Sequence, residues 1–440
     1  MSNIGTTYGY HCRLPLDVDP LDRLPAVVDW AGDLPYVVYE GHGPGRIAIG
    51  AAAWLKLSAG GITTSWGSGT HAPDMSELAA LLRSCPLAGR RAYGWAAFEL
   101  ALHLARVPTG VATDETLLYL MIPEVEVVAT ANGAEIRADD RRRAEALADS
   151  LATDRPEPGR RARVEVDLLA GADHYVSSVA LAVDEIRSTG LDKVILSRPV
   201  PVPATTDLGA IYQRGRAVVP SARSYLVQLG GWRIAGFSPE TVVEVDDGGL
   251  VRTQPLAGTR AAGLGAERDA ANRSELLSDL KEIAEHAMSV YHAFGELAAV
   301  CEPDSVRANE FMDVLDRGSV QHLASAVTGR LRPSCDAWDA FASLFPSVTA
   351  SGIPKVAAYD AIRRLETAPR GLYSGAVLTA AADGSLDAAL VLRTVLSRGG
   401  RTWLRAGAGI VSASDPAREL QETREKLMSV APHLVTSGPT

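Results

Sequence analysis

The chain has 440 residues, of which 47% are hydrophobic, and it carries a formal net charge of −10. A chain of this length can form two or three domains, although large α/β and α+β enzymes often build one continuous core. The acidic balance argues against a nucleic-acid partner, because binding to phosphates normally requires a concentrated basic face.

The four cysteines lie far apart in the sequence and form no C-x-x-C pair. No histidines cluster with them at metal-ligand spacing, so we interpret them as reduced thiols. Residues 1–15 lack a basic stretch followed by an apolar run, and no segment approaches the roughly 18 apolar residues that a membrane span requires. We therefore expect a cytoplasmic protein without a membrane partner.

The clearest change of composition lies at residues 137–163, where a charged, helix-like run passes into a segment rich in Pro, Gly and Arg. We interpret this segment as a surface connection. Before it, short apolar runs alternate with turn residues, which indicates strands of an antiparallel sheet. We predict a mostly β amino-terminal part over residues 1–165 and a region over residues 166–440 that carries the functional site, together forming one continuous domain.

Helix and strand signals are stronger in the second half of the chain. Asp173 is a plausible N-cap for a helix that stops at Gly190, and the β-branched residues 193–202 indicate a strand. Further patterns predict strands within residues 224–245 and 373–411, and helices over residues 267–299, 355–365 and 416–430. Because strands dominate and their separations are often hairpin-like, we predict an α+β fold with mainly antiparallel sheets covered by helices.

Two of the predicted helices carry acidic residues on one face. Glu282 and Glu285 are three positions apart, while Glu419, Glu422 and Lys426 fall within an arc of about 60° on their helix. Two such helices facing one another could supply carboxylate ligands to Mg²⁺. The spacing alone equally fits a solvated helix face on which the carboxylates pair with neighbouring basic residues.

Three single residues and one glycine run also have two interpretations each. Lys193 begins an apolar strand, where a lysine is more often an edge or surface charge than a base. Glu240 could be a turn residue or a general acid, and His322 could be a core residue or part of a site. The glycines of residues 405–410 could bring amides close to a bound carboxylate or relieve crowding in a sheet.

Nine segments together resemble the chorismate-utilising enzymes, which include anthranilate, aminodeoxychorismate, isochorismate and salicylate synthases. In chain order they are KVILSR (193–198), FSPETVVEV (237–245), PLAGTR (255–260), KEIAEH (281–286), GSVQHL (318–323), FPSVTASGIPK (345–355), RGLYSGAV (370–377), RAGAGI (405–410) and ELQETREKL (419–427). The resemblance is greatest to the salicylate synthases of mycobactin- and yersiniabactin-type siderophore pathways. It implies a β-sandwich-like core flanked by helices, and a buried site for chorismate beside Mg²⁺.

The resemblance also implies roles for individual residues. Glu285 and Glu422 would be the principal metal ligands, with Glu282 and Glu419 beside them or acting through water. Lys426 would meet the ring carboxylate of the substrate. The remaining substrate contacts would come from Gly258 and Thr259 along the pocket wall, from His322 near the ring, and from Tyr373, Arg393, Gly407 and Gly409 at the enolpyruvyl carboxylate.

Within the family, Lys193 is typical of enzymes that add water instead of ammonia. Lys193 would then deprotonate water for attack at C2, while Glu240 protonates the departing C4 hydroxyl, giving isochorismate. The loop at residues 345–355, with Thr349 at its centre, resembles that of enzymes that go on to eliminate pyruvate and form salicylate. Gln254 departs from the Glu that close relatives often have before PLAGTR.

The resemblance therefore implies a monomeric, Mg²⁺-dependent salicylate synthase without a glutaminase partner. Two alternatives stay open at this point. One is an isochorismate synthase without lyase activity, and the other is a non-catalytic paralogue that binds chorismate.

Overall fold

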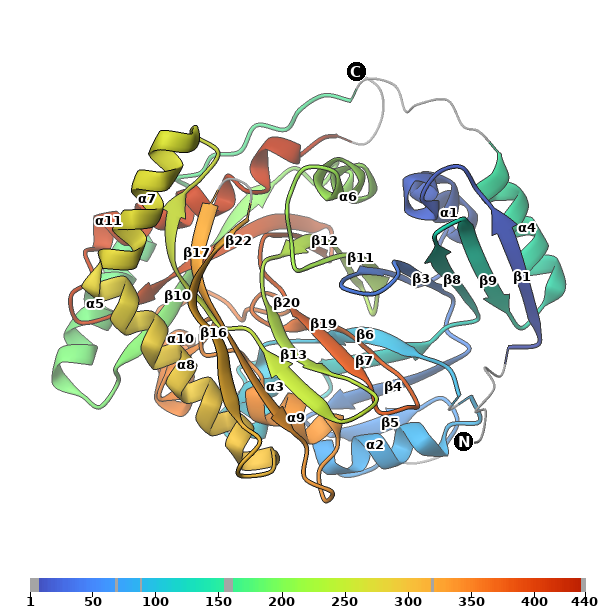
Figure 1. The fold of residues 1–440 in the computed structure, drawn as a ribbon, viewed down its shortest axis with the longest axis horizontal. Coiled ribbons are helices and arrows are strands. Elements are labelled where there is room, and N and C mark those ends of the chain that lie inside the picture. The colour runs from blue at the N-terminus through green and yellow to red at the C-terminus, as the bar shows by residue number, and fades with distance from the viewer. Residues whose placement is uncertain (1–7, 68–69, 88, 154–160, 318–319, 437–440) are drawn as a thin grey trace.

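Two antiparallel sheets of eleven strands each form the centre of the molecule (Figure 1). The computed structural model describes residues 8–67, 70–87, 89–153, 161–317 and 320–436. The first sheet has the order β1 (Tyr10–Pro15), β9 (Gly133–Ala138), β8 (Val125–Thr130), β3 (Arg46–Ile49), β2 (Tyr36–Glu40), β11 (Arg223–Leu229), β12 (Trp232–Ser238), β21 (Thr394–Arg398), β22 (Arg401–Ile410), β10 (Lys193–Val202) and β18 (Gly352–Ile353).

The second sheet has the order β15 (Leu256–Ala261), β17 (Val320–Arg330), β14 (Leu250–Thr253), β13 (Thr241–Val245), β20 (Leu386–Leu390), β19 (Ala376–Ala380), β6 (Ala92–Ala96), β7 (Thr116–Ile122), β4 (Ala53–Ser58) and β5 (Gly61–Thr64), with β16 (Arg307–Asp316) also paired to β17. Strands from the first 165 residues join later strands in both sheets, because β2 pairs with β11 and β6 pairs with β19. The predicted division of the chain at residue 165 is not visible as a boundary between sheets and stays a prediction.

The sheets pack face to face, and helices cover their outer faces. Alternation along β11 shows the arrangement: Tyr225 and Val227 contact the other sheet, whereas Leu226 belongs to the cluster under the helices. Strands buried on both faces have nearly continuous apolar sequences, as in TLLYLMI of β7. The predicted α+β sandwich flanked by helices is therefore confirmed.

Helices cover the outer faces of both sheets (Figure 1). Those packed on the first sheet include α1 (Leu24–Ala31), α4 (Arg141–Ala152) and α6 (Leu208–Arg216). Those associated with the second sheet and with β10 are α2 (Met75–Ser84), α3 (Glu99–Leu104), α5 (Ala172–Ser188), α7 (Ala266–Ser278), α8 (Leu280–Val300), α9 (Ala337–Leu344) and α10 (Lys355–Leu365). The last helix, α11 (Pro416–Leu427), packs on β22 and α5.

Several predicted boundaries are exact and others are wrong. The strand at residues 193–202 and the helix at residues 355–365 have the predicted limits. The single helix predicted over residues 267–299 is two helices, because Asp279 ends α7 and its side chain caps α8 by accepting from the amides of Lys281 and Glu282. This break places Glu282 and Glu285 in the first two turns of α8.

Smaller corrections concern the other helices. The helix predicted to begin at Asp173 begins instead after Gly171, whose positive φ of 73° suits glycine, and Asp173 lies in its first turn. The helix predicted to reach residue 430 ends at Leu427. The connection predicted after α4 falls mainly on residues 154–160, which lie outside the described residues.

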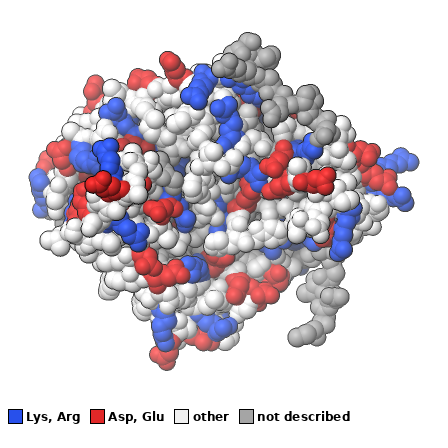
Figure 2. Space-filling model, turned by 45° about the horizontal axis from the view of Figure 1, so that its top comes forward, with Lys and Arg blue, Asp and Glu red and all other residues white. Residues whose placement is uncertain are grey.

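The four cysteines are unpaired, as the sequence indicates. Within the described residues, no helix is long and apolar enough to cross a membrane. Basic and acidic side chains are interspersed over the face shown in Figure 2.

A buried charge network joins β10 and β22 of the first sheet to the end of α10. Glu366 accepts from the amide and hydroxyl of Ser197 on β10, and it forms ion pairs of 2.7 Å with Arg370 and 2.5 Å with Arg405. Burial would raise the pKa of Glu366, but the two arginines outweigh it and hold that pKa below its usual value. The network fixes the part of β22 that precedes the glycines at residues 407 and 409.

Replacing Glu366 with Gln should destabilise the fold by about 3–5 kcal/mol, because Arg370 and Arg405 then remain buried without a counterion. Urea unfolding followed by circular dichroism measures the effect. As a control, Glu185→Gln removes the partner of the exposed Arg364 and should cost less than about 1 kcal/mol. Equal losses in the two variants would contradict a stabilising role for the network.

Candidate active site

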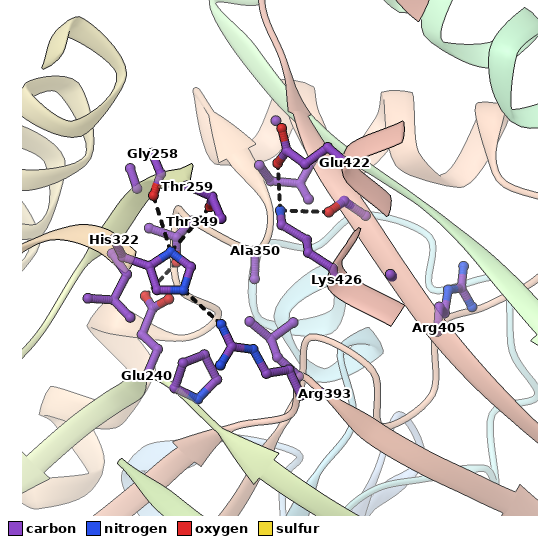
Figure 3. A pocket seen from close by; sticks show the side chains of 18 of the residues that line it. Glu240, Gly258, Thr259, His322, Thr349, Ala350, Arg393, Arg405, Glu422 and Lys426 are labelled. Carbon is purple, nitrogen blue, oxygen red and sulfur yellow. Dashed lines mark hydrogen bonds and ion pairs between the residues drawn. The ribbon is translucent and has the colours of Figure 1, made fainter. Parts of the chain in front are cut away.

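One cavity gathers nearly all the residues that the sequence singles out. The cavity opens between the ends of the two sheets, with α8 and α11 beside it. Figure 3 shows part of its lining. The predicted residues that line it are Lys193, Glu240, Gly258, Thr259, Glu282, Glu285, His322, Thr349, Tyr373, Arg393, Gly407, Gly409, Glu422 and Lys426. Glu419 lies outside this lining but contacts Lys281, which belongs to it. The structure therefore brings the predicted residues together, while their roles stay predictions.

Each of the four glutamates on α8 and α11 has a basic side chain beside it. The ion pairs are Glu282 with Arg260 at 3.3 Å, Glu285 with Lys193 at 2.8 Å, Glu419 with Lys281 at 3.4 Å and Glu422 with Lys426 at 2.8 Å. The alternative of a solvated helix face is wrong, because Glu419 is 1% exposed and the other three are also largely buried. Burying several carboxylates together requires such compensation by positive charge.

The carboxylates differ in how easily they ionise. Burial, followed by repulsion from a neighbouring glutamate, raises the pKa of Glu282 and of Glu419. Burial would also raise the pKa of Glu422, but Lys426 outweighs it and lowers that pKa. The Lys426–Glu422 ion pair is the one drawn in Figure 3.

The end of the cavity that the glutamates line has oxygen ligands of the kind that a hard divalent cation prefers. Glu282 and Glu285 of α8 and Glu422 of α11 line it with carboxylate oxygens, and Oε2 of the neighbouring Glu419 is buried without a hydrogen-bond partner. A Cβ atom at residue 409 would lie 2.7 Å from Oε1 of Glu285, so glycine keeps space open beside that carboxylate. Among the described residues, no three His, Cys, Asp or Glu side chains stand close enough together to form a ligand set.

Lys193 is buried at the start of β10, with 1% of its side chain exposed. The interpretation of an edge or surface lysine is wrong, because β10 lies between β22 and β18 in the first sheet. Its Nζ faces the cavity beside Glu285, and Gly409 on the neighbouring strand leaves room for its Cε.

Glu240 lies between β12 and β13 and is buried against the loop at residues 345–355. Its Oε1 accepts hydrogen bonds from Ser347 at 3.0 Å and Thr349 at 2.5 Å. Burial raises the pKa of Glu240 to about 7, although the two hydroxyl bonds and the charge of Lys193 act in the opposite direction. A carboxyl group with this pKa can donate a proton near neutral pH.

His322 and Arg393 contact each other on another side of the cavity (Figure 3). Nη2 of Arg393 lies 2.7 Å from Nε2 of His322, and Nδ1 of His322 contacts the carbonyl oxygen of Gly258 at 3.1 Å. Burial and the charge of Arg393 lower the pKa of His322 well below its ordinary value. The neutral ring therefore donates from Nδ1 to Gly258 and accepts at Nε2 from Arg393.

The glycines of β22 point their backbone groups along an edge that has no partner strand among the described residues. Pairing with β21 reaches only Leu404. Ile195, opposite Gly409, donates its amide to Ser351 and accepts from Arg370 at its carbonyl, so neither group bonds to Gly409. In an antiparallel ladder, Gly409 therefore directs its own amide and carbonyl away from β10. Gly407, two residues earlier, has the same orientation, and its carbonyl accepts from Nζ of Lys426 at 2.9 Å.

Sequence reasoning missed several residues that shape the cavity. Lys281 and Arg405 line it, Ser347 bonds to Glu240 and Arg260 pairs with Glu282, but the sequence assigned none of the four a role in a site. All four lie inside segments that carry the resemblance: Arg260 in PLAGTR, Lys281 in KEIAEH, Ser347 in FPSVTASGIPK and Arg405 in RAGAGI. Polar residues within those segments were the available signal.

The chain is similar in sequence to known proteins. The sequence profile of the chorismate binding enzymes matches residues 35–432. A salicylate synthase from Mycolicibacterium paratuberculosis is 41% identical over 438 residues, covering 96% of this chain and 95% of that protein. An anthranilate synthase component 1 from Acetivibrio thermocellus is 36% identical over 266 residues, covering 60% of this chain and 54% of that protein.

Solved structures show the same architecture. Anthranilate synthase component I from Streptococcus pneumoniae has a TM-score of 0.76 at 27% identity and covers 88% of this chain and 92% of its own. The menaquinone-specific isochorismate synthase MenF from Escherichia coli has a TM-score of 0.74 at 22% identity, covering 97% of this chain and 95% of its own. The second similarity concerns the fold alone.

Replacing Thr349 with Val should raise the pKa of Glu240 above its value of about 7, because a hydrogen bond that favours the ionised carboxylate is lost. Infrared difference titration against Glu240→Gln isolates the carboxyl band of this residue. Thr367→Val, outside this cavity, serves as the control and should leave the band unchanged. An identical titration midpoint with and without the Thr349 hydroxyl would contradict the assigned contact.

Proposed function

The chain belongs to the chorismate binding enzyme family, and from this premise we propose that it is a salicylate synthase acting on chorismate by way of isochorismate. The observation that carries the proposal is the placement of buried Lys193 and Glu240 in one cavity. Similarity to a salicylate synthase over 96% of the chain supports the identity of the product.

The first step adds water at C2 and removes the hydroxyl at C4. Lys193 takes a proton from water as the water oxygen bonds to C2, and the ring double bonds shift. Glu240 gives its proton to the C4 oxygen, which leaves as water. Its pKa of about 7 supports the acid role, because a substantial fraction is protonated at neutral pH. The step is an isomerisation, since one water enters and one leaves.

The second step eliminates pyruvate from isochorismate. The hydrogen on C2 passes to the methylene carbon of the enolpyruvyl group as the C3–O bond breaks, and the ring becomes aromatic. No dedicated base is required by this transfer, so the pocket contributes mainly by holding the enolpyruvyl group over C2. Thr349 bounds this part of the cavity and is fixed by its hydrogen bond to Glu240.

The two substrate carboxylates need separate partners. The enolpyruvyl carboxylate would meet Arg393 and Tyr373, together with the amides of Gly407 and Gly409 on the unpaired edge of β22. The ring carboxylate would meet Lys426. The contact between Arg393 and His322 supports this division, because it orients the guanidinium within the cavity.

Mg²⁺ is part of the proposal. Glu285 and Glu422 would be its principal ligands, with Glu282 and Glu419 beside them or acting through water. When bound, the ion would neutralise the charge of the ring carboxylate and of the developing reaction centre. Lys193 and Lys426 must then give up the ion pairs that they form with Glu285 and Glu422.

Two related activities serve as alternatives. An isochorismate synthase would use the same Lys193 and Glu240 pair and stop before pyruvate loss. An aminating activity is less well supported, because sequence similarity to the anthranilate synthase relative covers 60% of this chain, against 96% for the salicylate synthase, and because Lys193 suits addition of water. The products distinguish these activities.

Incubation with chorismate and Mg²⁺ should release salicylate and pyruvate in equal amounts, measured by chromatography and by a lactate dehydrogenase assay. Lys193→Gln should abolish both products while the circular dichroism spectrum stays unchanged. Isochorismate that accumulates without pyruvate would remove the lyase assignment. Anthranilate that forms only when ammonium is added would replace the proposed function altogether.

A chelator should stop turnover, and added Mg²⁺ should restore it. Calorimetric titration with Mg²⁺ gives a readout independent of activity: Glu422→Gln should weaken binding at least about tenfold, because a charged ligand is lost. Glu425→Gln on the exposed face of the same helix is the matched control and should bind Mg²⁺ normally. Full activity in excess chelator would refute the metal requirement.

A further inference from the structure

Lys281 lies in the first turn of α8 and lines the cavity beside the glutamates. Its Nζ is 3.4 Å from Oε1 of Glu419, so this ion pair joins α8 to α11. The side chain of Lys281 is 36% exposed, whereas that of Glu419 is 1% exposed. The pair therefore connects a cation that reaches solvent to a carboxylate that does not.

Lys281 is the least anchored of the four basic side chains beside the glutamates. Arg260 forms ion pairs with two further carboxylates, and Lys426 also donates to a backbone carbonyl of β22 at 2.9 Å. Lys193 is 1% exposed and has almost no access to solvent. Among the described residues, Glu419 is the single partner of the Lys281 ammonium group. Release of this group therefore breaks one contact and leads directly to water.

Glu419 is incompletely compensated by this lysine. Its Oε2 is buried without a hydrogen-bond partner. The separation of 3.4 Å at Oε1 exceeds the roughly 2.7–2.9 Å of a strong charge-assisted bond. Because a buried carboxylate oxygen without a partner is unfavourable, Glu419 has capacity for a cation that approaches more closely than Lys281 does.

We propose that Lys281 is a displaceable counterion of Glu419 that sets the affinity of the cavity for its divalent cation. The identity of that cation as Mg²⁺ rests on the proposed function. An ion held by Glu285 and Glu422 would share the cavity with the Lys281 ammonium group, and repulsion between the two positive charges weakens binding. Lys281 relieves this repulsion by turning toward solvent, which its exposure permits.

The same lysine serves the protein when no ion is bound. It supplies positive charge to a carboxylate that is buried in every state of the cavity, so the glutamates need not wait for a metal to be compensated. Carboxylate count sets how tightly a site holds a hard divalent cation. Lys281 therefore lets several carboxylates stand together while the ion still binds reversibly.

Calorimetric titration with Mg²⁺ in the absence of substrate tests this role. Lys281→Met should bind Mg²⁺ on the order of tenfold more tightly, because a positive charge beside the ion is removed. Lys281→Arg, which keeps the charge, should bind Mg²⁺ within about threefold of the unmodified protein. A lysine that only stabilised the fold would give no gain in affinity when it is removed.

Thermal unfolding gives a second readout that needs no turnover. Without Mg²⁺, Lys281→Met should unfold at a lower temperature, because Glu419 loses the charge that compensates it. Saturating Mg²⁺ should then raise its Tm by more than that of the unmodified protein, since tighter binding stabilises the folded state further at equal ion concentration. If Lys281→Met does not fold without the ion, Lys281→Gln replaces it with the same expected gain in affinity.

The control is Arg268→Met, which removes an exposed positive charge from the neighbouring helix α7. It should leave the affinity for Mg²⁺ within about twofold, because exposed charges are screened by salt. Unchanged or weaker Mg²⁺ binding by Lys281→Met would overturn the proposal, as would equal tightening in Arg268→Met. Absence of Mg²⁺ binding from both the unmodified protein and Lys281→Met would overturn it together with the proposed metal site. Salicylate formation by the unmodified protein is measured separately, so loss of the Lys281 role alone leaves the proposed function standing.

Discussion

The ion pair between Lys193 and Glu285 is the contact on which the arrangement of the site depends. It joins the first residue of β10, which lies between β22 and β18, to the second turn of α8, at 2.8 Å. Three further carboxylates beside it are each compensated by a basic side chain. Without such compensation, several charges could not be buried together, and the cavity could not combine proposed metal ligands with a proposed base.

The sandwich places these charges by bringing together segments that are distant in the chain. The sheet that holds Lys193 also holds Gly407 and Gly409, whereas Glu240 approaches from the junction between the two sheets. Behind the cavity, Glu366 holds β10, β22 and the residues after α10 in one network. The stability of the core and the geometry of the site therefore share the same strands.

Much of the fold and of the candidate site could be predicted from local patterns and from motif resemblance. The apolar run that begins at Lys193 gave an exact strand, and the nine segments led to residues that share one cavity. The break at Asp279 was missed, because helical periodicity continues through a residue that both ends one helix and caps the next. Burial of Lys193 could not be inferred, since it depends on strand order across the sheet.

The central claim is that water supplies the new oxygen at C2 before pyruvate is lost. Turnover of chorismate in H₂¹⁸O, with the products analysed by mass spectrometry, tests it directly. The account predicts one ¹⁸O atom in each salicylate molecule, located in the hydroxyl group next to the carboxylate. Salicylate formed without the label would contradict it.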